Sequence, residues 1–204
     1  MNTLIIGGTS GLGLALGMLF QGSGSTVYVT GRSSRDIAKE LTFIELNITE
    51  DIDRLEQDLD GMFLRLPKID LIIYGAGSWE NGHIDELSDN HIVQMIHTGL
   101  TAPALILQRI IKRQGLLPGF IAITSTSQWT PRELEPVYTG VKAGLAMLAQ
   151  SASLDAKVGK VLVAGPTGMK TNFWATGNRD MTDLLSPEEV AEEVLRLWNE
   201  TYRY

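Results

Sequence analysis

Cysteine is absent from the 204 residues of this chain, and histidine occurs only three times. Without cysteine there is no disulfide framework, no thiol nucleophile and no zinc–thiolate site. The three histidines are His83, His91 and His97, and the last two are six positions apart, which would put them on different faces of a helix. We therefore expect no metal site, and the lack of cysteine fits a cytoplasmic protein.

An excess of positive charge and a long hydrophobic run are also missing. Lys and Arg number 17 against 24 Asp and Glu, a net charge of −7, and no basic run is present to neutralise nucleic-acid phosphates. The first apolar stretch reaches glycines after six residues, too early for a signal peptide. With 44% hydrophobic and 20% charged residues, the composition is that of a globular domain. We expect one cytoplasmic domain over residues 1–204, with no nucleic-acid or membrane partner.

Short β-rich runs alternate along the chain with segments of helical period. The predicted strands are Thr3–Ile6, Thr26–Thr30, Thr42–Leu46, Ile69–Tyr74, Phe120–Thr124 and Lys160–Ala164. Most are continuously apolar, as strands covered on both faces are. The alternation predicts an α/β fold with a doubly wound, Rossmann-like parallel sheet of about six strands.

The helical segments differ in how clearly they are marked. Those with the required period are Leu12–Gln21, a stretch from Ile52 to Phe63 after a possible Thr49 cap, Asn90–Gln114 and Pro136–Ala156. The last helix is the clearest, because Ser186 can cap it, Pro187 occupies its first position and Glu189 completes a capping box. The stretch from Ser33 to Glu40 offers at most a short helix.

Glycines crowd the point where the first strand must turn into the first helix. The segment reads Gly7-Gly8-Thr9-Ser10-Gly11-Leu12-Gly13. Glycines allow a sharp bend and a close approach to a pyrophosphate, whose charge the free amides and dipole of a helix N-terminus favour. A tight turn with glycines for packing is the alternative, but the strand before and the helix after favour a nucleotide site.

The end of the second strand indicates which dinucleotide is bound. A carboxylate there accepts from the 2′-hydroxyl of NAD, whereas a 2′-phosphate requires a guanidinium. The sequence has Arg32 followed by Ser33, without a carboxylate in the same place. This favours NADP(H) over NAD(H), although Arg32 as a solvated loop charge and the nearby Asp36 remain alternatives.

Three polar side chains in the second half of the chain have the spacing of a catalytic group. Tyr138 and Lys142 are four residues apart at the start of a helix, so both project from one face. Ser125 lies 13 residues before the tyrosine, just past a predicted central strand. Taken separately, these residues could equally be an exposed Tyr–Lys pair and a strand-end hydroxyl.

Together with the glycine loop, these residues resemble the short-chain dehydrogenase/reductase family over nearly the whole chain. The resemblance implies that Tyr138 is the general acid or base and that Ser125 hydrogen-bonds the substrate oxygen. Lys142 would bind the nicotinamide ribose and lower the pKa of the phenol. The implied cofactor contacts are Gly7, Thr9, Ser10, Gly11, Leu12, Gly13, Arg32, Ser33, Asn47, Ile48, Gly75, Ala76, Gly77, Tyr138, Lys142, Pro166, Thr167, Met169 and Thr171. For residues 47–48 and 166–171, simple strand-end turns are the alternative.

The sequence also departs from the family pattern. Gly99 stands where the family has an asparagine that holds a water in a proton relay, and Tyr74 begins the segment that is usually Asn-Asn-Ala-Gly. We also expect the sheet to lack the final strand that most members have. The variable substrate loop matches Asn172 to Leu185 and carries Phe173, Trp174 and Met181, while Trp79 and Trp129 are candidates for the mouth of the site. These aromatics do not identify a substrate, because core packing explains each of them equally well.

Two functions from different classes follow. The first is an NADP(H)-dependent oxidoreductase that moves hydride between nicotinamide and a carbonyl compound or secondary alcohol. The second is an NADP(H)-binding sensor or scaffold that lost efficient chemistry, which Gly99 and Gly75 would explain; a sugar-nucleotide epimerase is a distant third because it needs a larger C-terminal domain. We expect a homo-oligomer, with a dimer favoured through the small residues Ala143, Gly144, Ala146 and Ala149.

Overall fold

The sheet confirms the predicted architecture. The computed structural model describes residues 1–34, 37–171, 173 and 182–200. Its six strands are all parallel and lie in the order β3-β2-β1-β4-β5-β6. They are β1 (Asn2–Ile6), β2 (Thr26–Gly31), β3 (Thr42–Glu45), β4 (Leu71–Tyr74), β5 (Leu117–Ile123) and β6 (Val158–Ala164).

The strand order reverses at the middle of the sheet. From β1 the chain adds β2 and β3 on one side, and then returns to add β4, β5 and β6 on the other. Ile5 of β1 therefore lies between Val29 of β2 and Ile73 of β4. In an open α/β sheet, such a switch point opens a crevice at the carboxyl ends of the strands, and this is where ligands bind.

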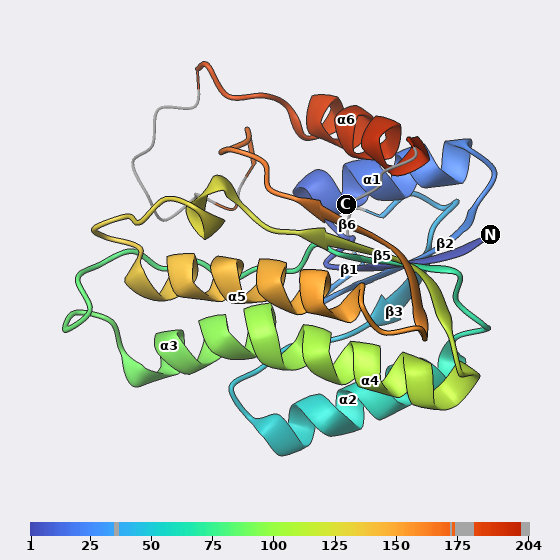
Figure 1. Cartoon of the computed structure of the whole chain (residues 1–204), viewed down its shortest axis with the longest axis horizontal. Helices are drawn as coiled ribbons and strands as arrows, with labels where there is room; N and C mark the ends of the chain where they lie inside the picture. The colour runs from blue at the N-terminus through green and yellow to red at the C-terminus, as the bar shows by residue number, and fades with distance from the viewer. Residues whose placement is uncertain (35–36, 172, 174–181, 201–204) are drawn as a thin grey trace.

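Helices cover both faces of the sheet, as Figure 1 shows. On one face lie α1 (Gly11–Gly22) and α6 (Pro187–Asn199); on the other lie α2 (Ile52–Arg65), α3 (Asp89–Ile96), α4 (Ala102–Gln114) and α5 (Pro136–Ala152). Leu4 and Ile6 belong to the core under the second group, whereas Ile5 belongs to the core under α1 and α6. The alternation of side chains along β1 thus builds two cores from one apolar run.

The predicted helix over Asn90–Gln114 is interrupted. A π-turn at His97–Thr101 joins α3 to α4, and the amide of Ala102 donates to the carbonyl of His97. The hydroxyl of Tyr74, at the end of β4, donates to the carbonyl of Thr98 inside this turn. The turn ends just before Pro103, which has no amide to donate inside a helix and was therefore a local signal of the interruption.

One other local prediction needs correction. Asp51 caps α2 instead of Thr49, because its carboxylate accepts from the amides of Asp53 and Arg54 at 3.0 and 3.1 Å. In the described part of the Ser33–Glu40 stretch there is no helix, which agrees with the prediction of at most a short one. Ile37 there packs against the core under α1.

We expect Ser186→Ala to lower the free energy of unfolding by about 1 kcal/mol. Ser186 and Glu189 form the predicted capping box, in which the Ser186 hydroxyl accepts from the Glu189 amide and the Glu189 carboxylate accepts from the Ser186 amide. Urea unfolding of both proteins measures the difference. Ser151→Ala, at an exposed position inside α5, is the matched control and should be neutral or slightly stabilising because alanine favours helix. An equal loss in both variants would contradict the capping role.

Candidate functional site

A cleft of about 730 Å³ opens at the carboxyl ends of the strands, at the switch point. It brings together residues from segments 7–13, 30–32, 46–50, 75–79, 123–125, 138–142 and 166–173. The residues predicted from sequence that line it are Gly7, Thr9, Ser10, Leu12, Gly13, Arg32, Asn47, Ile48, Gly75, Ala76, Gly77, Ser125, Tyr138, Lys142, Pro166, Thr167, Met169 and Thr171. Gly11 lines the adjoining cavity, and Ser33 lies just beyond Arg32, outside the described lining of either.

The glycine loop contains positions where a side chain would be strained or would clash with the backbone. Gly7 and Gly11 have φ angles of +79° and +51°, which disfavour any residue with a Cβ. A Cβ on Gly13 would lie 2.1 Å from the carbonyl oxygen of Gly7. The N-cap residue of α1, Ser10, makes no side-chain capping bond, and the first turn of α1 carries no acidic residue. The amides of Gly7 and Gly8 donate to Thr30, and the N-terminal turn of α1 borders the cleft, where a helix favours an anion.

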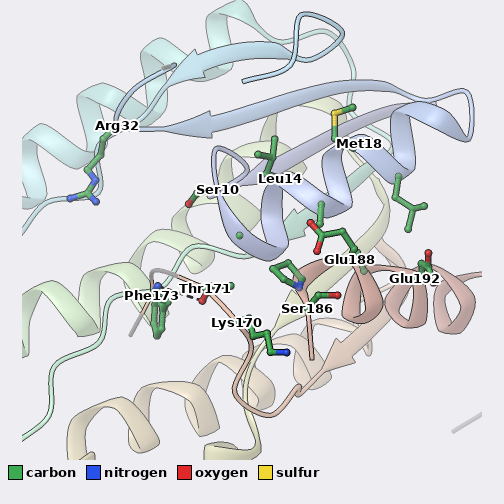
Figure 2. Close-up of a pocket in the computed structure, with 15 residues that line it drawn as sticks. Ser10, Leu14, Met18, Arg32, Lys170, Thr171, Phe173, Ser186, Glu188 and Glu192 are labelled. Carbon is green, nitrogen blue, oxygen red and sulfur yellow. Dashed lines mark hydrogen bonds between the residues drawn. The ribbon is translucent and has the colours of Figure 1, made fainter. Parts of the chain in front are cut away.

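Arg32 lies at the boundary between the cleft and a second cavity of about 1050 Å³ between α1 and α6. Figure 2 shows its side chain projecting from the end of β2, with Ser10 nearby and with Lys170 and Ser186 across the cavity. Thr171 and Phe173 border both spaces. Asp36, the alternative partner for a ribose, lies outside the described residues.

Tyr138 and Lys142 are buried side by side on the first turns of α5. Their residues are only 4% and 5% exposed, so the alternative of an exposed surface pair is wrong. The Lys142 ammonium lies 5.7 Å from the centre of the Tyr138 ring and donates to the carbonyl of Ile123 at 3.1 Å. Burial lowers the pKa of Lys142 from 10.5 to about 8. A positive charge beside the phenol is thus held in a poorly solvated position.

Ser125 follows β5 and takes part in a hydrogen-bond network that the sequence did not predict. The amide of Ser127 donates to the Ser125 hydroxyl at 3.2 Å, and the two hydroxyl oxygens are also 3.2 Å apart. Arg132 donates to the Ser127 hydroxyl at 3.0 Å and lies 3.6 Å from the Glu135 carboxylate. This network restricts the orientation of the Ser125 hydroxyl. Its members sit in an irregular segment, where neither spacing nor periodicity gave a signal.

The wall of the cleft formed by α3 was also missed. Gln94 of α3 donates to the carbonyl of Ile48 at 2.6 Å and to the hydroxyl of Thr98 at 3.0 Å. Gln94 and Thr98 both line the cleft, and they connect the segment after β3 to the π-turn. Only helical periodicity was visible at these positions, and it does not say which helix face meets a cleft.

The aromatic candidates separate into two groups. Trp79 lines the cleft, whereas Trp129 is 70% exposed and lies outside the described lining. The ring of Phe173 lies 6.3 Å from that of Tyr138. Asn172 and residues 174–181, which include Trp174 and Met181, fall outside the described residues.

Most of the small residues proposed for a dimer interface serve packing inside the chain. Ala146 and Ala149 are buried, and a Cβ on Gly144 would lie 2.7 Å from Leu100. Ala143 is partly exposed. Homodimerisation therefore stays a prediction.

Neither a metal cluster nor a membrane span is found in the described part of the chain. No group of three or more His, Asp or Glu side chains there is arranged to hold a metal ion. No described helix combines the length and apolar character needed to cross a bilayer.

The strand order, the switch-point cleft and the glycine loop together define an α/β protein of the Rossmann type. The sequence profile of the short chain dehydrogenase family matches residues 1–182. The chain therefore belongs to this family of oxidoreductases.

Individual relatives are distant. Short-chain dehydrogenase/reductase prx4 of Penicillium rubens is 24% identical over 161 residues, covering 72% of this chain and 47% of the relative. The chain thus spans about half the length of that protein. A 3-phenylpropionate-dihydrodiol/cinnamic acid-dihydrodiol dehydrogenase of Escherichia coli is 28% identical, covering 92% of this chain and 76% of the relative.

Solved structures agree with the fold. A short-chain dehydrogenase/reductase from Vibrio parahaemolyticus has a TM-score of 0.83 at 24% identity, covering 99% of this chain and 94% of that one. A short-chain dehydrogenase from Sphingobium yanoikuyae in complex with NADPH has a TM-score of 0.81 at 17% identity, covering 97% and 84%. A 4-hydroxyisoleucine dehydrogenase complexed with NADH also has a TM-score of 0.81, at 18% identity, covering 98% and 90%.

Proposed function

We propose that this protein is an NADP(H)-dependent oxidoreductase that interconverts a small carbonyl compound and the corresponding alcohol. The observation that carries the proposal is the burial of Tyr138 beside Lys142 in the same cleft as Ser125 and the glycine loop. Structural neighbours that contain NADPH or NADH support a nicotinamide cofactor. Composition and family resemblance lead us to expect a cytoplasmic homodimer.

The residues of the cleft fit such a cofactor and divide the work of carbonyl reduction. The glycine loop would hold the pyrophosphate, and residues 166–171 would contact the carboxamide. When bound, the nicotinamide supplies the hydride that reduces the carbonyl carbon. Ser125 would donate a hydrogen bond to the substrate oxygen, and Tyr138 would deliver the proton that completes the alcohol.

Lys142 would act on Tyr138 through its charge. Bringing a phenol from its ordinary pKa near 10 to about 7 requires roughly 4 kcal/mol of stabilisation of the phenolate. An ammonium about 5 Å away supplies roughly 3 kcal/mol at an effective dielectric constant of about 20. The Lys142 ammonium lies 5.7 Å from the ring centre of Tyr138, a separation of the same order. The same ammonium would bind the hydroxyls of the nicotinamide ribose.

The preference for NADP(H) rests on Arg32, and we expect Arg32→Ala to weaken NADPH while sparing NADH. A charge-assisted contact to the 2′-phosphate is worth about 1.5–3 kcal/mol, so the NADPH dissociation constant should rise about 10- to 150-fold. Fluorescence titration with both cofactors measures this. Arg54→Ala, at an exposed position on α2, is the matched control. An equal loss for NADPH and NADH would show that Arg32 does not read the phosphate.

The first test of the activity is NADPH oxidation by the purified protein. The panel contains ketones, aldehydes, diketones and quinones, and binding of NADPH is measured in the same samples. Turnover of any of these substrates supports the proposal. Tight NADPH binding without turnover would instead favour the second candidate, a cofactor-binding sensor, for which Gly99 in place of the family asparagine is the specific observation.

A further inference from the structure

Gly99 lies where two helices approach each other closely next to the proposed catalytic residues. A Cβ on Gly99 would lie only 1.9 Å from Cγ1 of Val141 on α5. At the next residue the glycine is on α5 and the branched side chain is on the π-turn. A Cβ on Gly144 would lie 2.7 Å from Cδ2 of Leu100. Each helix thus contributes one glycine and one branched apolar side chain to the crossing. In Figure 1, α5 runs alongside α3 and α4 at this place.

The π-turn that carries Gly99 is held from the sheet. Tyr74 ends β4 and is fully buried, and its hydroxyl donates to the carbonyl of Thr98. Burial raises the pKa of Tyr74, so its hydroxyl remains a donor at all ordinary pH values. Interruptions of this kind in helices are frequent at functional sites. The turn therefore has a fixed position relative to the end of the sheet, where the cleft lies.

Val141 connects the π-turn to the helix that carries the proposed catalytic residues. It is 6% exposed and precedes Lys142 on α5, which also carries Tyr138. A valine in a helix has one strongly preferred rotamer, so it cannot easily turn away from a new neighbour. The backbone around Ser125 is anchored to the end of β6, because the amides of Thr124 and Thr126 donate to the carbonyls of Ala164 and Pro166. A shift of α5 would therefore separate Tyr138 and Lys142 from Ser125 as a unit.

We propose that Gly99 is a positioning residue, which seats α5 through Val141 so that Tyr138 and Lys142 meet the substrate oxygen and cofactor together with Ser125. In its catalytic consequence the inference rests on the proposed function. The packing of this chain then requires a glycine at position 99, so Gly99 is more than the loss of the asparagine that the family uses in a proton relay. Restoring the family residue with Gly99→Asn should lower turnover, because its Cβ meets Val141 as any other would.

The central experiment compares Gly99→Ala with the double variant Gly99→Ala/Val141→Ala. In the double variant Cγ1 is removed, and the nearest remaining atom, Cβ of residue 141, lies 3.4 Å from the new Cβ, an acceptable contact. We expect kcat to fall about 10- to 100-fold in Gly99→Ala, the range for a displacement near 1 Å, and the NADPH dissociation constant to rise by a smaller factor. Both should recover in the double variant. All proteins are assayed well below their melting temperatures.

Gly61→Ala on α2 is the control, because a Cβ there meets nothing within 4 Å. It should leave kcat and NADPH affinity unchanged. If Gly99→Ala does not fold, Gly144→Ala and its rescue by Leu100→Ala test the same crossing, since the flexible end of Leu100 can yield more than Val141. The kcat and affinity of the folded protein, not its melting temperature, decide the outcome.

The outcomes separate the two proposals. Wild-type kcat and NADPH affinity in Gly99→Ala would overturn the positioning role, as would a double variant that regains thermal stability without regaining kcat or NADPH affinity. Suppose instead that the wild type turns over no carbonyl compound, but NADPH affinity falls in Gly99→Ala and returns in the double variant. The proposed catalytic function would then be wrong, while the seating of α5 by Gly99 would stand.

Discussion

Tyr138→Phe is expected to reduce kcat by about 10²- to 10⁴-fold, the contribution of a positioned general acid. The substitution removes one oxygen and keeps the ring, which packs near Phe173 in the cleft. Cofactor affinity should change little, because the glycine loop and Lys142 remain. Stopped-flow or steady-state NADPH oxidation, with NADPH binding measured alongside, gives both quantities.

A matched control is available on β2. Tyr28→Phe removes the same hydroxyl from a half-buried tyrosine that packs on the core outside the described lining of the cleft. Its turnover should equal that of the wild type. If Tyr138→Phe also kept full activity, Tyr138 would not be the proton donor, and the proposed mechanism would be wrong.

Lys142→Met is expected to abolish turnover and, in the absence of cofactor, to stabilise the fold near neutral pH. The buried ammonium carries a penalty, since burial lowers the pKa of Lys142 from 10.5 to about 8, which corresponds to about 3 kcal/mol. Removing the ammonium removes this penalty, but it also removes the hydrogen bond to the Ile123 carbonyl, which costs about 1 kcal/mol. A net increase of about 2 kcal/mol in the free energy of unfolding at pH 7 should remain.

The difference in the free energy of unfolding between Lys142→Met and the wild type should depend on pH. Between pH 8 and 10.5 the unfolded chain holds a proton on Lys142 that the folded chain has lost, so wild-type stability rises with pH through this window relative to Lys142→Met. The advantage of the variant is full below pH 8. Above pH 10.5 the penalty is gone and only the lost hydrogen bond remains, so the variant should be less stable than the wild type by about 1 kcal/mol. Urea unfolding at several pH values measures it. Lys157→Met, at an exposed position, should show no such pH-dependent difference; if the two variants behaved alike, the burial argument would fail.

Activity and stability thus oppose each other at Lys142. A buried charge is tolerated here although an apolar side chain would be more favourable. If the proposed mechanism is correct, the compensation lies in catalysis: a poorly solvated ammonium acts on a nearby phenol more strongly than a hydrated one. The opposite signs of the two effects in one variant distinguish a functional lysine from a structural one.

Features encoded within a few residues were predictable from the sequence. The six apolar runs predicted the strands, because a strand buried on both faces needs apolar residues throughout. The glycines between β1 and α1 predicted a sharp bend from strand to helix, and the positive φ of Gly7 and Gly11 confirms that bend. Ser186 and Glu189 predicted the start of α6, since a cap acts within one turn.

Features that join distant segments were not predictable in this way. The spacing of Tyr138 and Lys142 places them on one face of α5, but their burial depends on the sheet and on the neighbouring helix. The hydrogen bond from Tyr74 of β4 to the π-turn and the close approach of Val141 to Gly99 both join segments that are distant in sequence. The orientation of Ser125 depends on Ser127 and Arg132 in an irregular loop.

The sequence by itself determined the fold class, the family resemblance and the residues with the spacing of a catalytic group, because periodicity, capping and the steric freedom of glycine act over one or two turns of chain. Only the tertiary structure decided that Lys142 is desolvated and that Val141 occupies the space that a side chain at position 99 would need. Burial and close packing arise where elements remote in sequence meet, and local patterns carry no record of which elements will meet.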